Sequence, residues 1–467
     1  MTPAGAVVEQ ALALSRADEA MVIVTDAHEA SLRWAGNSMT TNGSSISRDW
    51  AVISIFREGP NSARVGSVSS TSVDPADIEA VVRASENAAR TAEPAKDAMP
   101  LLTPDGADGV PGARNDTADW ASAPGSTGIE VFTEVARDLA GGFDGTDRLY
   151  GFAHHQMHTT WLGTSTGIRR RFVQPTGSVE INGKRSAGTD LASAWVGVGT
   201  ADFTDVDVPG LLSELSRRLD WSKRRVDLPA GRYETLLPPS AVADLMIYLA
   251  WSMEGRGAHE GHNAFAKAGG TRIGERLSAI PLTLFSDPSA DGLEYRPFVA
   301  TPSSSESLSV FDNGMPAERV DWLRAGVIES LVYPRATAAE FGATATVPGA
   351  NLLLTGGSGT TLDTMIANTE RGLLLTTLWY IREVDPATLL LTGLTRDGVY
   401  LVENGEVTAA VNNFRFNESP IDLLRRATEA GATETTLPRE WKDWFTRTAM
   451  PPLRIPDFHM SSVSQAT

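Results

Sequence analysis

The chain has 467 residues, a formal net charge of −18 at pH 7 and no cysteine. This length predicts two or three domains, each able to bury a core of its own. The excess of acidic residues is spread along the chain and argues against a nucleic-acid partner, because phosphate backbones are bound by clustered Lys and Arg. The lack of cysteine excludes disulfides, thiolate zinc sites, iron–sulfur clusters and a cysteine nucleophile.

The sequence gives no sign of a membrane or export segment. Its apolar stretches, such as residues 245–251, are far shorter than the ~18–20 residues that span a bilayer. The first basic residue, Arg16, follows a mixed segment instead of preceding an apolar core, which is the reverse of a secretory leader. We therefore expect a cytoplasmic protein with no membrane partner.

Residues 1–228 predict an N-terminal α/β domain of short strands and helices. Apolar residues recur at helical spacing from Val7 to Leu12, and Asp74-Pro75 begins a second helix. Another helix is marked by leucines between Leu211 and Leu219. Short strands are expected at residues 20–24, 32–36, 51–56, 149–162, 172–173 and 178–181. The last of these is expected to turn at Asn182-Gly183, a pair that favours tight turns.

Residues 93–128 interrupt this domain. They are rich in Pro, Gly, Ala and Asp and show little periodicity, so burial would not offset the entropy lost on ordering them. We expect a mobile surface insertion. The alternative is a lid over the functional site, with apolar anchors at Leu101, Leu102, Val110 and Trp120.

Residues 229–467 predict a C-terminal domain dominated by antiparallel β-sheet, so the fold class is α+β. A helix is expected at residues 241–253, and turn pairs such as Asp397-Gly398 separate the strands that follow. The clearest hairpin turns at Asn404-Gly405, because only Asn, Asp and Gly readily adopt the positive φ of such a turn. A late helix is expected at residues 421–429, behind Ser419-Pro420.

Histidines offer the first candidate chemistry. The zinc-peptidase patterns are HExxH and HExxxH. His259-Glu260 is followed by His262, which is too close for either, and His28-Glu29 has Arg33 where a second His might stand. The Gly-rich surroundings of His259 favour a polar loop.

His154, His155 and His158 form the densest histidine cluster. Flanking aromatic and Thr residues favour a strand, where a four-residue step of ~13 Å keeps His154 and His158 from one metal ion.

Two loop motifs are weak. Residues 163–167 fit GxSxG by letter, but the basic, β-prone run that follows favours a turn between strands over a nucleophile elbow. The Gly-rich residues 356–361 lack the Lys of a phosphate-binding loop and favour a tight turn.

Short stretches across the second half carry a family resemblance. They stand in family order at residues 272–275 (Arg-Ile-Gly-Glu), 351–354, 362–366, 371–374, 398–407 and 451–458. In these the chain resembles the TldD/PmbA family, cytoplasmic proteins whose two subunit types, TldD and TldE (also called PmbA), together make a peptidase.

The resemblance also implies which subunit type this is. The catalytic TldD type carries HExxxH on the helix that opens this domain, ahead of a Glu-Gly pair, and a later Cys completes its zinc site. Here the matching pair is Glu254-Gly255, and Met246, Ile247 and Trp251 stand where His, Glu and His would be. The helix is apolar at helical spacing, so it is expected to pack a core or an interface.

The resemblance thus implies a metal-free TldE-type subunit with no catalytic residue, no metal ligand and no cofactor of its own. Zinc is expected in a TldD-type partner, and small unfolded peptides are the expected substrates. Two other interpretations stay open. One is a stand-alone peptide-binding protein without catalysis. The other is an independent metallohydrolase that uses His259, Glu260 and His262, or the His154 cluster.

Overall fold

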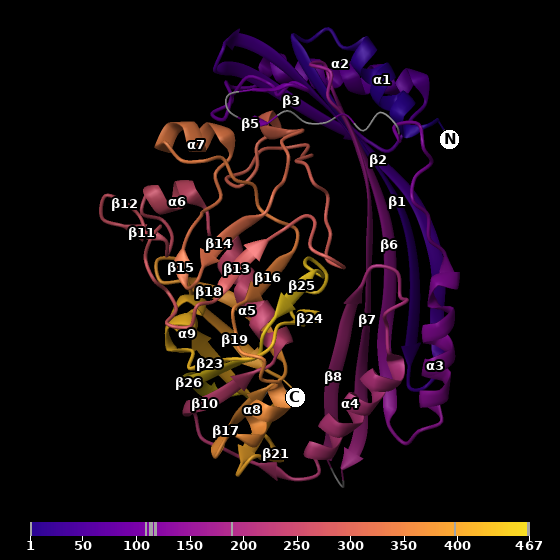
Figure 1. The fold of residues 1–467 in the computed structure, drawn as a ribbon. Helices are drawn as coiled ribbons and strands as arrows, with labels where there is room; N and C mark the ends of the chain where they lie inside the picture. Colours follow the sequence, from indigo (N-terminus) through magenta and orange to yellow (C-terminus); the bar gives the residue numbers. More distant parts are fainter. Residues whose placement is uncertain are drawn as a thin grey trace.

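The computed structural model describes residues 2–107, 110–111, 115, 119–187, 190–396 and 398–464. The predicted α+β class is confirmed: a long antiparallel sheet forms the first half, and two further large sheets form the second (Figure 1). In the described ranges, no helix is long and apolar enough to cross a membrane.

The first-half sheet has six strands in the order β3-β2-β1-β6-β7-β8, all paired antiparallel. The strands are β1 (Glu19–Ala35), β2 (Met39–Gly59), β3 (Ser62–Ser70), β6 (Arg148–Thr164), β7 (Arg169–Ala187) and β8 (Asp190–Thr200). Two residue pairs, β4 (Gly106–Ala107) and β5 (Val110–Pro111), form a separate small ladder.

The prediction of short strands in this half is wrong for all but the strand at residues 149–162, which β6 matches closely. The stretches expected at residues 20–24 and 32–36 are the two ends of one strand, β1, which is 17 residues long. Its middle part buries Ala30 on one face, whereas Glu29 and Ser31 lie only half-buried on the other. Because the second face is polar there, the sequence shows no continuous apolar run to mark the strand.

The turn expected at Asn182-Gly183 is also wrong. Both residues lie inside β7, where Asn182 pairs with Tyr150 on one side and Trp195 on the other. A Cβ on Gly183 would come within 2.9 Å of the side chains of Leu215 and Leu219. The glycine therefore allows a helix to pack closely on the strand.

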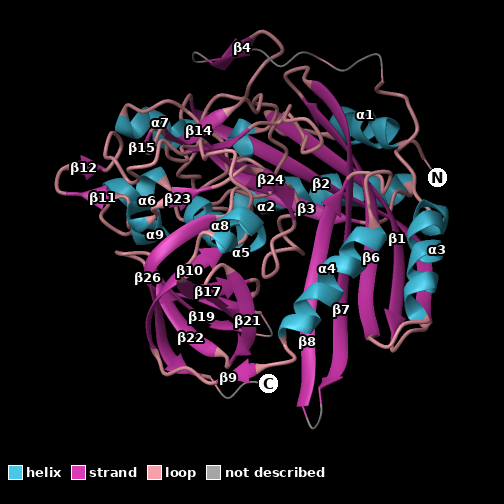
Figure 2. Cartoon of the chain, turned by 60° about the horizontal axis from the view of Figure 1, so that its bottom comes forward, coloured by secondary structure: helices cyan, strands magenta, loops and turns pink. Residues whose placement is uncertain are grey.

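Helices cover one face of this sheet. They are α1 (Ala4–Leu14), α2 (Pro75–Thr91), η1 (Ile129–Phe132), α3 (Thr133–Phe143) and α4 (Val208–Trp221). Figure 2 shows α3 and α4 lying along the strands. Side chains alternate along β1, and its even-numbered residues Ala30, Leu32 and Trp34 pack under these helices. The helix predicted behind Asp74-Pro75 is confirmed as α2.

The opposite face of the same sheet meets the second half of the chain. At one end of β1, Met21 and Ile23 pack against Phe298 and Phe311 from the second half. Farther along β1, this face becomes polar at Glu29 and Ser31. The two halves are therefore joined by an apolar contact at one end of the sheet, and polar side chains line the space beyond it.

The second half is built on a curved ten-stranded sheet in the order β18-β19-β22-β26-β10-β17-β20-β21-β9, with β23 paired to β26 (Figure 2). Its strands are β9 (Arg225–Val226), β10 (Gly231–Leu237), β17 (Arg371–Leu375), β18 (Leu378–Asp385), β19 (Leu390–Thr395), β20 (Val399–Glu403), β21 (Glu406–Val411), β22 (Phe414–Glu418), β23 (Glu429–Ala430) and β26 (Leu453–Val463). The predicted hairpin is confirmed as β20 and β21, with Asn404 and Gly405 at φ 51° and 82°.

A six-stranded sheet and short helices complete this half. The sheet contains β13 (Thr283–Ser286), β14 (Val320–Arg324), β15 (Val327–Ile328), β16 (Leu352–Thr355), β24 (Glu434–Thr436) and β25 (Thr448–Met450). A separate ladder joins β11 (Ala266–Lys267) and β12 (Gly270–Thr271). The helices are α5 (Pro239–Trp251), α6 (Gly255–His259), η2 (Val310–Asp312), α7 (Arg335–Phe341), α8 (Leu362–Ala367) and α9 (Pro420–Arg426). The late helix predicted at residues 421–429 is α9, which ends earlier than predicted, at Arg426. The predicted turn pair Asp397-Gly398 lies partly outside the described residues.

The predicted insertion at residues 93–128 is described only in part. Leu101 and Leu102 are buried in two clusters that include residues of the second half, and Trp120 packs beside α1. The side chain of Val110 lies outside the described part of the chain, as do residues 108–109, 112–114 and 116–118. Mobility of this segment and the boundary at residue 228 stay predictions.

Candidate functional site

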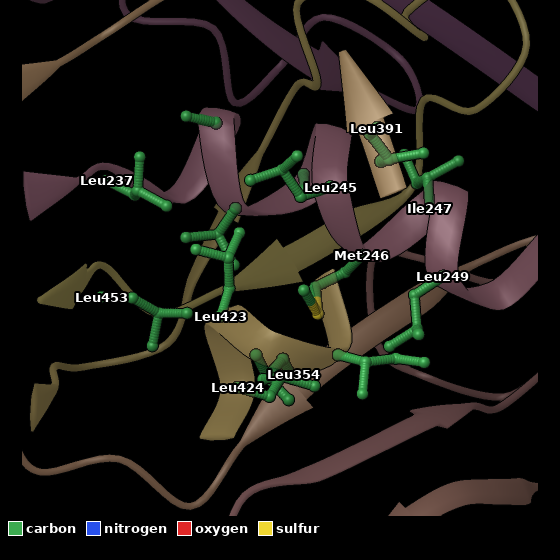
Figure 3. Close-up of a cluster of buried hydrophobic side chains, with 14 of the residues drawn as sticks. Leu237, Leu245, Met246, Ile247, Leu249, Leu354, Leu391, Leu423, Leu424 and Leu453 are labelled. Atoms are coloured by element: carbon green, nitrogen blue, oxygen red, sulfur yellow. The ribbon is translucent and has the colours of Figure 1, made fainter. Parts of the chain in front are cut away.

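Helix α5 holds the positions that would correspond to a zinc motif. Met246 and Ile247 are 1% and 0% exposed, respectively. Met246 lies among Leu354, Leu423 and Leu424, which come from β16 and α9 (Figure 3). Two of the three positions are therefore core residues.

The third position, Trp251, lies at the end of α5 and is 43% exposed. Its ring centroid is 5.0 Å from that of Trp441, in an edge-to-face arrangement, and 6.2 Å from that of Tyr248. Trp441 and Tyr248 are themselves 5.7 Å apart. Trp251 is thus one member of an aromatic cluster at the surface.

The single carboxylate of α5, Asp244, is fully buried. Its oxygens accept the backbone N–H groups of Arg439, Glu440 and Trp441 at 3.3, 2.9 and 3.3 Å. Burial raises the pKa of Asp244 well above its usual range. Asp244 therefore fixes the turn at residues 439–441 to α5, a role that the sequence analysis missed although a lone carboxylate in an apolar helix was a signal for it.

His154 and His158 lie on the predicted strand, now confirmed as β6, on the polar face toward the second half. Their Nε2 atoms are 4.0 and 3.8 Å from the carboxylate of Glu29 on the neighbouring strand. Burial lowers the pKa of both rings, and Glu29 opposes this shift. His155 points to the other face, where its ring bonds Thr127 and the carbonyl of Ala201.

The second histidine group, His259 and His262, does not converge on one point. The ring of His259 stacks on Phe341 at 4.1 Å, and its Nε2 lies 3.2 Å from the Tyr333 hydroxyl. The His262 side chain is 71% exposed and faces Glu260 at 3.4 Å. Across the described part of the chain, no three His, Cys, Asp or Glu side chains are grouped so that they could hold a metal ion.

Both loop motifs are turns, as predicted. Residues 163–167 connect β6 to β7, and the Ser165 hydroxyl accepts the backbone N–H of Ala20 at 3.0 Å. Gly356 has φ +97°, and a Cβ there would meet the carbonyl oxygen of Pro281 at 2.4 Å.

A cavity of about 750 Å³ lies between the two halves. The first half contributes side chains of β6, β7 and β8, and the second contributes the start of β18 and the turn held by Asp244. Four cationic side chains line it: Lys184, Arg225, Arg396 and Arg439. Three aromatic side chains do so as well: Tyr150, Trp195 and Trp379. No sequence pattern marks this site, because its residues are far apart in the chain.

Two family models match the chain. Residues 20–89 match the PmbA/TldA metallopeptidase domain 1, and residues 230–462 match the PmbA/TldA metallopeptidase C-terminal domain. The chain belongs to the TldD/PmbA family. Comparison with curated proteins gives no match.

Several solved structures share the fold of this chain. TldE from Thermococcus kodakarensis is 15% identical, with a TM-score of 0.77 over 97% of this chain and 98% of that one. A protein described as a putative modulator of DNA gyrase from Bacteroides thetaiotaomicron is 17% identical, with a TM-score of 0.75 over 98% of both chains. A protein from Thermotoga maritima with the same description is 14% identical, with a TM-score of 0.75 over 97% of this chain and 99% of that one. At these identities the likeness concerns the fold.

Proposed function

We propose that this chain is the metal-free, TldE-type subunit of a two-component zinc peptidase of the TldD/PmbA family. The proposal rests on one observation above all. The helix that would carry HExxxH in the catalytic type places Met246 and Ile247 in the core and Trp251 in an aromatic cluster. None of these side chains is a zinc ligand.

The residues around α5 do not fit a zinc ion. Zinc in proteins is held by imidazole, thiolate or carboxylate groups. The one such group on α5 is the carboxylate of Asp244, and it already accepts three backbone N–H groups. We therefore assign zinc, and the water that it activates for peptide hydrolysis, to a TldD-type partner.

In this assembly, the chain contributes shape and recognition. Its cavity between the two halves carries aromatic and cationic side chains that can contact a peptide. The partner supplies the Lewis acid and base, and the substrates are small unfolded peptides. The compartment that we propose is the cytoplasm.

Reconstitution tests this function. The purified chain alone is expected to leave an unstructured peptide intact, whereas a mixture with a TldD-type chain carrying HExxxH is expected to cleave it. The control is the same mixture in which the Glu of HExxxH in the partner is replaced by Gln. Chelator-resistant cleavage by this chain alone would contradict the proposal, and so would a partner whose activity is the same with and without this chain.

A second candidate is a stand-alone peptide-binding protein without catalysis. The observation that favours it is the cavity itself, which lies within a single chain and needs no partner residue to form. Size-exclusion chromatography with a TldD-type chain separates the candidates: co-elution supports the subunit role, and separate elution with retained peptide binding supports the second.

A further inference from the structure

The cavity between the two halves contains polar groups that the fold leaves without partners. The Nε of Arg439, the Nε1 of Trp379 and the Oγ1 of Thr377 are buried, and none has a hydrogen-bond partner in the described structure. All three residues line the same cavity, and Thr377 is only 5% exposed. A buried polar atom without a partner is costly, so three around one cavity point to a ligand or water that completes them.

The three groups share a chemical preference. Arg439 Nε and Trp379 Nε1 can only donate a hydrogen bond, and the Thr377 hydroxyl can donate as well. The guanidinium of Arg439 lies 4.4 Å from the ring centroid of Trp379 and 5.2 Å from that of Trp195. These contacts hold the guanidinium between two indoles, and burial lowers its pKa. A ligand for this set must be an acceptor, and a negative charge suits it best.

The charged side chains that line the cavity are all cationic. Lys184 on β7, Arg225 on β9 and Arg396 line it together with Arg439. They form a cationic site in a chain whose formal net charge is −18. Cationic side chains that line a cleft attract anions into it.

The carboxylates that act on Arg439 do not complete its hydrogen bonds, because other groups engage them. Glu180 accepts the indole N–H of Trp195 at 3.1 Å and pairs with Lys442 at 3.0 Å. Glu440 accepts the backbone N–H of Ile381 at 3.1 Å. Asp443 pairs with Lys442 at 3.0 Å, and Asp244 accepts backbone N–H groups. The Nε of Arg439 therefore has no hydrogen-bond partner among these carboxylates.

We propose that this cavity binds a carboxylate of a peptide through Arg439, Trp379 and Thr377. The carboxylate is either the C-terminus or an acidic side chain, and Tyr150, Trp195 and Leu191 provide apolar surface for the residues beside it. The choice of a peptide as carrier rests on the proposed function, whereas the anion site follows from the cavity itself.

Isothermal titration calorimetry on the full chain, without any partner, tests the site. The probes are acetyl-trialanine with a free C-terminal carboxylate, the same peptide as its amide, and acetyl-Ala-Glu-Ala amide. We expect the free carboxylate to bind at least ten-fold more tightly than the trialanine amide, with weaker binding at high salt. Binding of acetyl-Ala-Glu-Ala amide as tight as that of the free acid shows that the site accepts either carboxylate, tighter binding assigns it to acidic side chains, and weaker binding assigns it to the C-terminus. Equal affinity for all three probes would overturn the proposal.

Substitutions of cavity residues test where the carboxylate binds. Arg439→Gln is expected to weaken carboxylate binding at least ten-fold, and Trp379→Phe, which keeps a stacking ring but removes the N–H donor, about five-fold. The matched control is Arg382→Gln, which removes a nearby cation that is 60% exposed and outside the cavity. If Arg439→Gln does not fold, Trp379→Phe still decides, and unchanged binding in that variant would refute the assignment.

The result is independent of peptidase activity. Carboxylate binding by the chain alone stands even if reconstitution with a TldD-type partner fails, and reconstituted activity without carboxylate binding would refute only the anion site. Inorganic phosphate is the competitor that tests selectivity: competition weaker than that of the free peptide supports the proposal, and equal competition would overturn the peptide assignment.

Discussion

Replacing Met246 with Ala tests whether this position of α5 is core or the remnant of a solvent-facing site. Met246 is 1% exposed and packs against side chains of β16 and α9, so collapse around a smaller residue requires three elements to move. Truncation of a buried Met to Ala costs about 2–5 kcal/mol, whereas a surface substitution stays within about 0.5 kcal/mol. Met246→Leu keeps the volume and should cost less than about 1.5 kcal/mol.

The assay is hydrogen–deuterium exchange of α5 amides read by mass spectrometry, because a local measurement does not require the whole chain to unfold in one step. Since 1.4 kcal/mol is a factor of ten, Met246→Ala should accelerate the slowest α5 amides roughly 30-fold or more, and Met246→Leu no more than about ten-fold. Protection of β1 amides in the first half serves as the internal reference. Unchanged α5 exchange in Met246→Ala would refute the core assignment.

Three further predictions follow from separate features of the chain. Elemental analysis of the purified protein should find no stoichiometric zinc, and about one zinc per chain that is lost in a His259→Ala, His262→Ala double variant would contradict this. Gly183→Ala should destabilise the first half by about 1–3 kcal/mol in urea unfolding, because its Cβ would overlap Leu215 and Leu219. A neutral effect would contradict the close packing of α4 on this glycine. Burial raises the pKa of Asp312 from 3.8 to about 6, so its ionisation should remove up to about 3 kcal/mol of stability as the pH rises from about 4 to 6. The melting temperature of the parent chain should therefore fall between about pH 4 and 6, whereas that of Asp312→Asn should fall less. Equal changes of melting temperature with pH in the two proteins would contradict this prediction.

Features governed by neighbouring residues were predictable from the sequence. The hairpin at Asn404-Gly405 forms because both residues adopt positive φ, and α2 begins at Pro75 because proline suits the first turn of a helix. The apolar character of α5 likewise predicted a buried helix. In each case the physical cause lies within a few residues of the pattern that revealed it.

Features governed by distant contacts were not predictable. The middle of β1 carries no continuous apolar run, because only one of its faces is buried there, so the sequence suggested two short strands. Asn182-Gly183 has the letters of a turn, but its glycine is needed for close packing of α4. The cavity brings together β7, β9, β18 and the 439–441 turn, which are separated by up to hundreds of residues and share no periodic signal.

Asp244 connects the two parts of the candidate site. It lies on α5, two residues before Met246, and its carboxylate holds the backbone of Arg439 in place. The helix that would bear the zinc motif in a catalytic subunit therefore fixes, in this chain, the turn that presents an arginine to the cavity between the halves. A buried carboxylate on an apolar helix is costly unless its hydrogen bonds are made, and here three backbone donors make them. In the proposed subunit, α5 therefore still serves the proposed carboxylate site without carrying a zinc ligand, because this helix determines where Arg439 lies.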